Sequence, residues 1–369
     1  MKCRYFLYAA VALLAACGPQ PPAAEELLEK EVEARLLEMS LPEKVGQLFY
    51  VRPEALQDSI PVGGVVIFAK DISGPEQLHA LVDSLHALPF HPLVCIDEEG
   101  GRVARIAGNR AFDVPRFASM AAVGASGKAR DAYDCGLAIG TYLKEYGIDV
   151  DFAPVADVNT NPSNPVIGNR AFSSDPAIAA QMVPAFLQGL QEAGVVGCLK
   201  HFPGHGDTRT DTHYGFAQSR KTWEEMLACE MLPFKAGIEA GAPLVMTAHI
   251  AVPAITGSNV PSTLSADMLE GKLRGELGFQ GVIVTDALGM GAISKLHSSG
   301  EAAVKAFQAG ADVLLMPDNL DQAYTAVLTA LSDSTLTQAR LDDSVRRILR
   351  MRLSHTAEGD AAGQPVALN

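Results

Sequence analysis

The sequence predicts an α/β fold, a (β/α)8 barrel of the TIM type built as one large domain. Two observations support this prediction. Short apolar runs recur eight times along the 369 residues, and helical patterns with one apolar face separate them. Each run is continuously apolar, which is typical of strands buried on both faces of a parallel sheet. Strands and helices that alternate eight times favour a closed barrel.

The predicted elements follow from these patterns and from the residues at their ends. The eight strands cover residues 47–51, 64–68, 93–97, 149–155, 197–201, 244–249, 282–286 and 313–316. Helical patterns cover residues 75–88, 129–146, 176–193, 222–240 and 266–277. Gly147, Gly194, Gly241 and Gly278 follow four of these helices, where glycine commonly ends a helix. An open doubly wound sheet is the alternative, although no glycine fingerprint follows the first strand.

Two further helices define the limits of the barrel domain. One covers residues 25–39 and precedes the first strand, and the other covers residues 337–353 and closes the barrel. We therefore place the single barrel domain at residues 41–353, preceded by a tether and helix over residues 17–40. Residues 354–369 are polar and small, so we predict a disordered tail.

The first 16 residues predict a signal peptide of the lipoprotein type. Lys2 and Arg4 precede an apolar stretch that is too short for a transmembrane helix. The stretch ends in LAAC, which resembles a bacterial lipobox and implies cleavage before Cys17 and acylation of its thiol. We expect an exported protein held to a membrane by this lipid, in the periplasm or at the cell surface. An ordinary signal peptide followed by a chance cysteine is the alternative.

The charge and the remaining cysteines exclude some classes of protein. The formal net charge is −14 at pH 7, which is poorly suited to binding phosphate backbones, so we expect no nucleic-acid partner. Apart from Cys3 and the proposed lipidation site Cys17, the cysteines are Cys95, Cys135, Cys198 and Cys229. Their wide spacings fit no zinc motif and no compact disulfide scaffold. Buried free thiols are expected, and a disulfide in an oxidising compartment is the alternative.

Polar residues gather where the predicted strands end. The residues concerned are Asp97, the pair Lys200 and His201, His249, and Asp286. In (β/α)8 barrels the active site forms at the C-terminal ends of the strands. Four polar ends at one mouth therefore predict a polar pocket. Asp286 follows four apolar residues and a threonine in GVIVTDALGM, and it is well placed to attack a bound substrate; a helix N-cap is the alternative.

The segment KHFPGHGDTRTDTH, residues 200–213, runs from a strand into a glycine-rich loop. Gly204 and Gly206 permit sharp turns. A further turn would let Asp211 accept a hydrogen bond from one ring nitrogen of His213 and raise the pKa of that ring, as a general acid requires. One alternative is a metal site on the three histidines 201, 205 and 213, but their spacings match no zinc pattern. The other is a set of polar groups that cap the loop.

At these residues the sequence resembles glycoside hydrolase family 3, and within it the β-N-acetylglucosaminidase (β-hexosaminidase) branch. The family pattern KH-F-PG-H/D-GD followed by D-S-H is matched at residues 200–213, with Thr212 in place of serine. The resemblance covers nearly all of the barrel. The β-glucosidase branch is not expected to carry the D-x-H element.

The resemblance implies a role for each matching residue. Asp286 corresponds to the nucleophile, His213 to the acid/base and Asp211 to its partner. The residues implied to bind the terminal sugar are Asp97, Arg105 in IDEEGGRVAR, Arg170 in VIGNRAF, Lys200 and His201. Glu98, Glu99 and Arg102 are candidates for supporting groups. No metal or cofactor is implied.

The implied activity is that of a retaining exo-β-N-acetylglucosaminidase. Such an enzyme removes terminal non-reducing N-acetylglucosamine from oligosaccharides through a covalent glycosyl-enzyme. Muropeptides, chitin fragments and glycoprotein glycans are the candidate substrates. Two departures from the branch are Ala287 after the nucleophile, where S-D-D-L is common, and the lipoprotein signal on a type of enzyme that is usually cytoplasmic.

Three other functions are open at this point. The first is a different family 3 exo-β-glycosidase, such as a β-glucosidase. The second is a noncatalytic glycan-binding lipoprotein, because a fold alone does not define function. The third is transfer of the sugar to phosphate in place of water. Neither the oligomeric state nor the membrane leaflet is indicated by the sequence.

Overall fold

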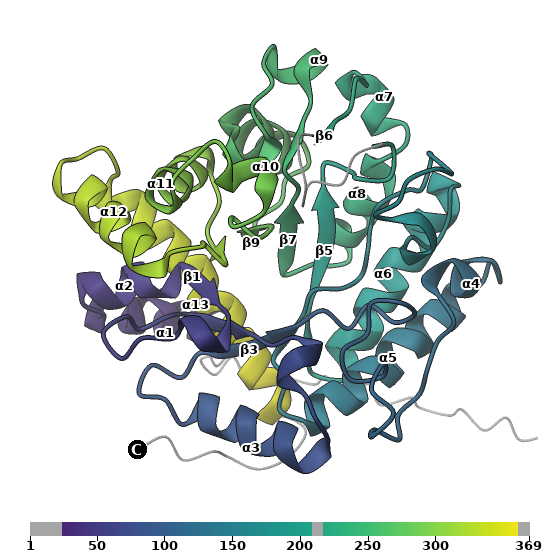
Figure 1. Ribbon diagram of the computed structural model, residues 1–369, viewed down its shortest axis with the longest axis horizontal. Helices are drawn as coiled ribbons and strands as arrows, with labels where there is room; N and C mark the ends of the chain where they lie inside the picture. Colours follow the sequence, from purple (N-terminus) through teal and green to yellow (C-terminus); the bar gives the residue numbers. More distant parts are fainter. Residues whose placement is uncertain (1–23, 209–216, 361–369) are drawn as a thin grey trace, which may run out of the picture.

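The structure is a computed structural model that describes residues 24–208 and 217–360. The predicted signal peptide, Cys17 and most of the tether lie outside the described residues, as do Asp211, His213 and residues 361–369. Figure 1 shows short strands around a central axis, with helices outside them.

Eight parallel strands form the main sheet, in the order β10-β1-β2-β3-β4-β5-β7-β9. They are β1 (Phe49–Val51), β2 (Gly64–Val66), β3 (Leu93–Ile96), β4 (Val150–Asp151), β5 (Val196–Phe202), β7 (Leu244–Thr247), β9 (Val282–Thr285) and β10 (Leu314–Leu315). The two end strands are joined by a parallel bridge between Val284 and Val313, which closes the sheet into a barrel. The (β/α)8 barrel is therefore confirmed, and each predicted strand overlaps an observed one.

The helices alternate with the strands along the chain. The longer elements are α1 (Ala24–Glu38), α2 (Leu41–Gln47), α3 (Pro75–His86), α4 (Met120–Gly124), α5 (Ala129–Glu145), α6 (Pro176–Glu192), α7 (Trp223–Leu227), α8 (Met231–Glu239), α9 (Pro253–Thr256), the π-type helix η5 (Asp267–Glu276), α10 (Gly291–Ser294), α11 (Ser299–Ala309), α12 (Leu320–Ser332) and α13 (Gln338–Asp360). Short 3-10 turns are η1 (Pro53–Ala55), η2 (Ala69–Asp71), η3 (Gly168–Arg170) and η4 (Ser262–Leu264). The four predicted terminating glycines all have positive φ, from 71° to 84°.

Two predicted helices need correction, and one small sheet was not predicted. The helix expected over residues 222–240 is two helices, α7 and α8. Pro233 explains the break, because in a continuous helix its ring would clash with the carbonyl of Cys229. The closing helix continues to Asp360, so residues 354–360 are not part of a disordered tail. The two-residue strands β6 (Ala217–Gln218) and β8 (Ile250–Ala251) pair in a second small sheet that the sequence did not predict.

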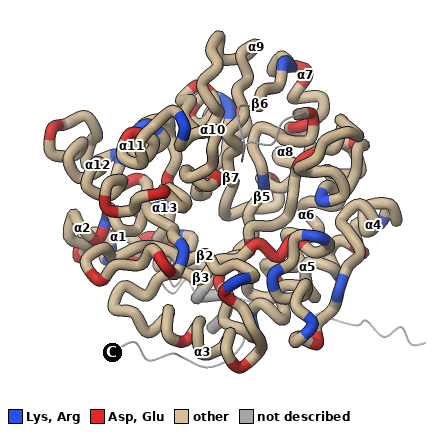
Figure 2. Tube along the Cα trace, viewed as in Figure 1, with Lys and Arg blue, Asp and Glu red and all other residues tan. Residues whose placement is uncertain are grey.

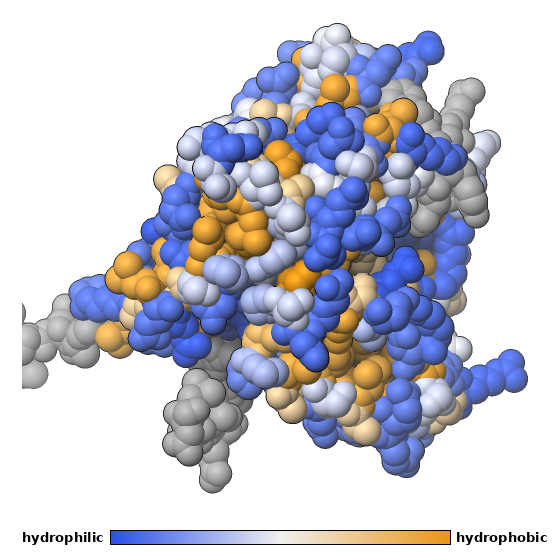
Figure 3. Space-filling view, turned by 60° about the vertical axis from the view of Figure 1, so that its left-hand side comes forward, coloured by the Kyte–Doolittle hydropathy of each residue, from blue (hydrophilic) through white to orange (hydrophobic). Residues whose placement is uncertain are grey.

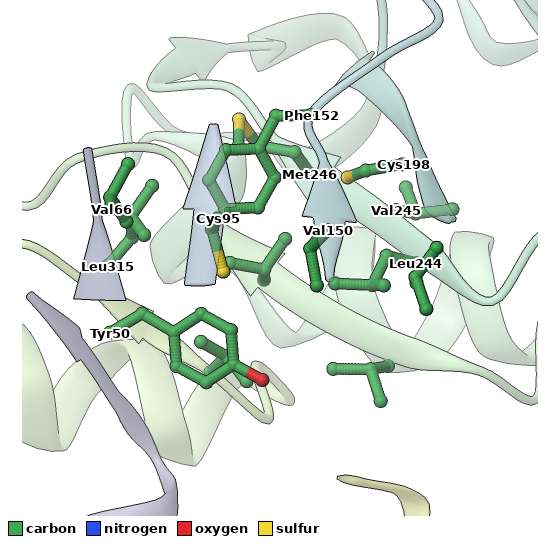
Figure 4. Close-up of a cluster of buried hydrophobic side chains, with 14 of the residues drawn as sticks. Tyr50, Val66, Cys95, Val150, Phe152, Cys198, Leu244, Val245, Met246 and Leu315 are labelled. Carbon is green, nitrogen blue, oxygen red and sulfur yellow. The ribbon is translucent and has the colours of Figure 1, made fainter. Parts of the chain in front are cut away.

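Apolar side chains from the strands fill the barrel interior. Figure 4 shows Tyr50, Cys95, Val150 and Phe152 among the residues that converge there, and all are fully buried or nearly so. This packing explains the continuous apolar runs, since both faces of each strand are covered. Among the four described cysteines, each is a free thiol and three are buried, which agrees with the expected buried thiols rather than a disulfide.

The N-terminal helix is attached to the outside of the barrel. Arg350 and Arg346 of α13 pair with Glu29 and Glu33 of α1. The face drawn in Figure 3 is mainly hydrophilic, with hydrophobic patches between charged side chains. Over the described residues, no helix has both the length and the apolar character needed to cross a membrane.

Candidate active site

A cavity of about 550 Å³ opens where the strands of the barrel end. This volume lies within the range of small-molecule sites. Its walls come from the segments after β1, β2, β3, β4, β5, β9 and β10 and from the end of β7. The cavity is lined by every described residue for which the sequence predicted a catalytic or sugar-binding role: Asp97, Arg105, Arg170, Lys200, His201 and Asp286.

Asp97 and Lys200 form the centre of a charged cluster on the cavity wall. Lys200 Nζ lies 2.7 Å from Asp97 Oδ1, and Arg105 Nη2 lies 3.3 Å from Asp97 Oδ2. Burial raises the pKa of the Asp97 carboxyl, but the charges of Lys200 and Arg105 and the hydrogen bond from Lys200 together outweigh burial and lower this pKa overall. Asp97 is therefore a fixed anion that can accept hydrogen bonds from ligand hydroxyls. Figure 2 shows acidic and basic residues around the barrel centre near β3 and β5.

Glu99, an almost fully buried residue of the cavity wall, extends this cluster. Its carboxylate accepts from Arg170 Nε and Nη2 at 2.8 and 2.6 Å, and its Oε1 lies 2.6 Å from Lys200 Nζ. Burial raises the pKa of Glu99, but Arg170 and Lys200 together hold it far below the usual value. This bidentate pair fixes the plane of the Arg170 guanidinium. Glu99 therefore orients both cations toward the ligand space.

His201 is held by Asp157, a fully buried residue that the sequence analysis missed. The Asp157 carboxylate lies 2.7 Å from His201 Nδ1 and accepts from the His205 backbone N–H at 2.5 Å. Burial raises the pKa of Asp157, but its contacts with His201 and His205 together outweigh burial and lower this pKa overall. Because a carboxylate only accepts, Nδ1 of His201 carries a proton and its Nε2 is left for the cavity.

The glycine-rich loop after β5 also needs its glycines, for two different reasons. Gly204 has φ +118°, which disfavours any side chain. Gly206 has no such φ, but a Cβ there would lie 1.9 Å from the Val158 carbonyl oxygen. The turn predicted at Gly204 is therefore present, whereas Gly206 permits a close backbone approach. Here His205 has a pKa lowered by burial.

Asp286 directly follows β9 and faces the cavity. Its backbone N–H donates to the Thr247 carbonyl at 2.9 Å, and its Oδ1 accepts from the Ala287 N–H at 2.7 Å. The N-cap alternative is wrong, because the next helix, α10, begins after its N-cap Met290. Asp286 is thus a carboxylate fixed at a strand end.

Two residues of the loop after β3, Glu98 and Arg102, do not line the cavity but hold neighbouring loops in place. Glu98 is fully buried and accepts from the backbone N–H groups of Ile106 and Ala107 at 2.9 and 2.8 Å, and from that of Arg105. Burial raises the pKa of Glu98. Arg102 donates to the Ile167 carbonyl at 3.2 Å, just before Arg170. Both residues therefore hold loops that carry sugar-binding candidates.

Asp211 and His213 lie outside the described residues, but both flanks of their segment are described. Before it, the Thr208 carbonyl accepts from Asn161 Nδ2 at 2.9 Å. After it, β6 pairs with β8, and Ser219 Oγ donates to Asp207 Oδ2 at 3.2 Å. The metal alternative requires His213 as well. In the described ranges no three His, Cys, Asp or Glu side chains are grouped to hold a metal ion.

The rest of the cavity wall is formed by residues for which no role was predicted from the sequence. These are Arg52, Phe68, Met246, Met290 and Asp318, among others. Arg52 and Arg105 both lie over the Phe68 ring, at 5.3 and 5.6 Å from its centroid. A polar residue just after each strand was the available signal for Arg52 and Asp318. Apolar wall residues carry no such signal.

The fold and this cavity define a class of protein: a (β/α)8 barrel whose strand ends form a polar pocket for a hydroxyl-rich ligand. Comparisons with known proteins identify the family. Residues 40–351 match the glycosyl hydrolase family 3 N-terminal domain. The chain therefore belongs to glycoside hydrolase family 3, as the sequence motifs implied.

Individual relatives agree with this assignment. The chain is 36% identical over 322 residues to Beta-hexosaminidase A of Pseudoalteromonas piscicida, which covers 79% of this chain and 53% of that protein. It is also 36% identical to the Beta-hexosaminidase of Nitrosomonas eutropha, over 72% of this chain and 77% of that one. A family 3 β-N-acetylglucosaminidase structure from Paenibacillus sp. superposes with TM-score 0.81 at 37% identity, covering 90% of this chain and 65% of the other. The chain thus spans about half the length of the Pseudoalteromonas relative.

Proposed function

We propose that this protein is a retaining exo-β-N-acetylglucosaminidase. The observation that carries the proposal is that Asp286 opens onto the same cavity as the Asp97, Lys200 and Arg170 cluster. A nucleophile and a hydroxyl-binding cluster in one pocket are what glycoside cleavage requires. The similarity to proteins named β-hexosaminidase supports N-acetylglucosamine as the sugar.

In the proposed mechanism, Asp286 attacks the anomeric carbon and forms a covalent glycosyl-enzyme. The bond to the leaving oxygen breaks as protonated His213 donates its proton to that oxygen. His213, now neutral, takes a proton from water, and the water displaces Asp286, so two inversions retain the configuration. Most retaining enzymes use a second carboxylate in this role. A histidine suits this role because the unperturbed pKa of imidazole, about 6.5, is near neutrality, so such a side chain can both donate and accept a proton.

The remaining cavity residues hold the terminal sugar in this proposal. Asp97 accepts from sugar hydroxyls, while Arg105, Lys200 and Arg170 donate to hydroxyl or carbonyl oxygens. His201 presents Nε2, because Asp157 occupies its Nδ1. Paired cations and anions suit a neutral ligand, since each hydroxyl can both donate and accept. We further propose that the protein is exported, lipidated at Cys17, and acts on cell-wall fragments or other scavenged oligosaccharides.

The test is a comparison of nitrophenyl glycosides at equal concentration. Release from N-acetyl-β-glucosaminide should exceed release from β-glucoside, and NMR should show the β-anomer as the first product. A preference for the glucoside would indicate another family 3 exo-glycosidase. Sugar binding without turnover of any glycoside would indicate a noncatalytic glycan-binding protein. Sugar phosphate formed in phosphate buffer would indicate transfer to phosphate. Defined muropeptides and chitin oligosaccharides would then separate the natural substrates.

A further inference from the structure

His249 is a fully buried histidine that does not line the cavity, although it lies next to the nucleophile's turn. It follows β7 by two residues, and its ring lies between that strand end and the turn after Asp286. Nε2 of His249 is 2.9 Å from the carbonyl oxygen of Ala287. Because a carbonyl only accepts, Nε2 carries the proton and donates it.

The other ring nitrogen of His249 also has a hydrogen-bond partner at the same distance. Nδ1 of His249 lies 2.9 Å from Thr263 Oγ1, and Thr263 is itself fully buried in η4. Thr263 Oγ1 is also 3.0 Å from Thr247 Oγ1, at the end of β7. The ring is therefore restrained at both nitrogens, by the buried Thr263 hydroxyl on one side and by the Ala287 carbonyl on the other.

These contacts are part of a cyclic hydrogen-bond network that includes Asp286, the proposed nucleophile. The Thr247 carbonyl accepts from the Asp286 N–H, and Asp286 Oδ1 accepts from the Ala287 N–H. The Ala287 carbonyl accepts from His249, the other ring nitrogen of His249 contacts the Thr263 hydroxyl, and that hydroxyl contacts the Thr247 hydroxyl. Ala287 is thus held at both its N–H and its carbonyl. Its N–H in turn keeps Oδ1 of Asp286 occupied, while the Asp286 side chain lines the cavity.

We propose that His249 is a positioning residue for Asp286, fixing the carboxylate rotamer through Ala287 without touching the substrate. The inference rests on the proposed function, since it assumes that Asp286 attacks the sugar. A misplacement of about 1 Å at a reacting group can cost on the order of 100-fold in rate. Loss of the Nε2 contact should therefore slow the attack by Asp286 and leave sugar binding unchanged.

Two substitutions of His249 distinguish the contributions of the hydrogen bonds at its two ring nitrogens. In His249→Gln the amide nitrogen reaches the level of Nε2 and can still donate to the Ala287 carbonyl. In His249→Asn the shorter amide ends at the level of Nδ1, so it can contact Thr263 but not Ala287. The pair therefore differs in the one hydrogen bond that the proposal requires.

The experiment measures glycosyl-enzyme formation in a single turnover of dinitrophenyl N-acetyl-β-glucosaminide, alongside calorimetric binding of free N-acetylglucosamine. His249→Asn should slow formation by about 10- to 100-fold with the same sugar affinity, whereas His249→Gln should stay close to wild type. A purely structural role would weaken binding and rate together in both variants. That result would overturn the proposal, as would wild-type rates in His249→Asn.

Thr263→Val provides a second route if His249→Asn does not fold. Valine keeps the shape of threonine but removes the hydroxyl that holds Nδ1. It should slow the same step by a smaller factor, and an unchanged rate would overturn the proposal. Failure of the proposed function has a different signature, because the wild-type protein itself would then form no glycosyl-enzyme.

Discussion

Lys200 Nζ lies 2.7 Å from Asp97 Oδ1, a contact that joins the end of β5 to the end of β3 across the barrel mouth. The two residues are far apart in the sequence, and only the closed sheet brings them together. Lys200 is almost wholly buried, and its pKa is raised by the two carboxylates that it contacts, against the effect of burial. The site is therefore a preorganised set of charges rather than a flexible polar surface.

Asp286→Asn should abolish glycoside cleavage while leaving the cavity intact. The amide has the same shape but cannot act as the nucleophile, so kcat should fall by about 10⁴-fold or more. Nitrophenyl N-acetylglucosaminide turnover is the measurement. Asp321→Asn changes an exposed carboxylate outside the cavity and should match wild type. Retention of more than a tenth of the activity in Asp286→Asn would refute the nucleophile assignment.

His213→Ala should lose about 10²- to 10⁴-fold in kcat on a disaccharide, because proton donation to the leaving oxygen is lost. A nitrophenol leaves without that proton, so the first step should be partly rescued with the nitrophenyl substrate. His297→Ala, outside the cavity, is the matched control. Full activity of His213→Ala on the unactivated disaccharide would show that another group is the acid.

Glu99→Gln should lower the free energy of unfolding by about 3–5 kcal/mol, because it leaves Lys200 and Arg170 buried with less compensating charge. Urea unfolding measures this change. Glu26→Gln breaks an exposed pair with Lys30 and should cost less than about 1 kcal/mol. Equal effects of the two substitutions would mean that the buried cluster does not need the Glu99 charge.

The depressed pKa values of Asp97 and Glu99 predict acid lability. Burial raises both pKa values, but the neighbouring cations lower them by a larger amount. Both carboxyls therefore have lower pKa values in the folded protein than in the unfolded chain. The unfolded chain then binds more protons at low pH, and stability present above about pH 4 should be lost as the pH falls below it. Tm measured from pH 6 to pH 3 should fall, and less steeply in Glu99→Gln. A Tm that rises over this interval would contradict the sign.

Continuous apolar runs predicted the barrel because strands buried on both faces need them. Polar strand ends predicted the charged residues at the centre of the cavity but not the rest of its wall. The helix break just before Pro233 shows that a local steric rule outweighed the periodic pattern from which one continuous helix was predicted. Asp157 was missed because it follows the predicted end of its strand, and its partner His201 lies on the next strand. The contact between His249 and the Ala287 carbonyl involves backbone, so no residue pattern encodes it.

Covalent labelling with a slow fluorinated N-acetylglucosaminide tests the central claim most directly. Peptide mass spectrometry of the trapped protein should place the sugar on Asp286 in GVIVTDALGM, with one label per chain and full inactivation. A label on a different residue, or continued turnover with no covalent species, would contradict the account.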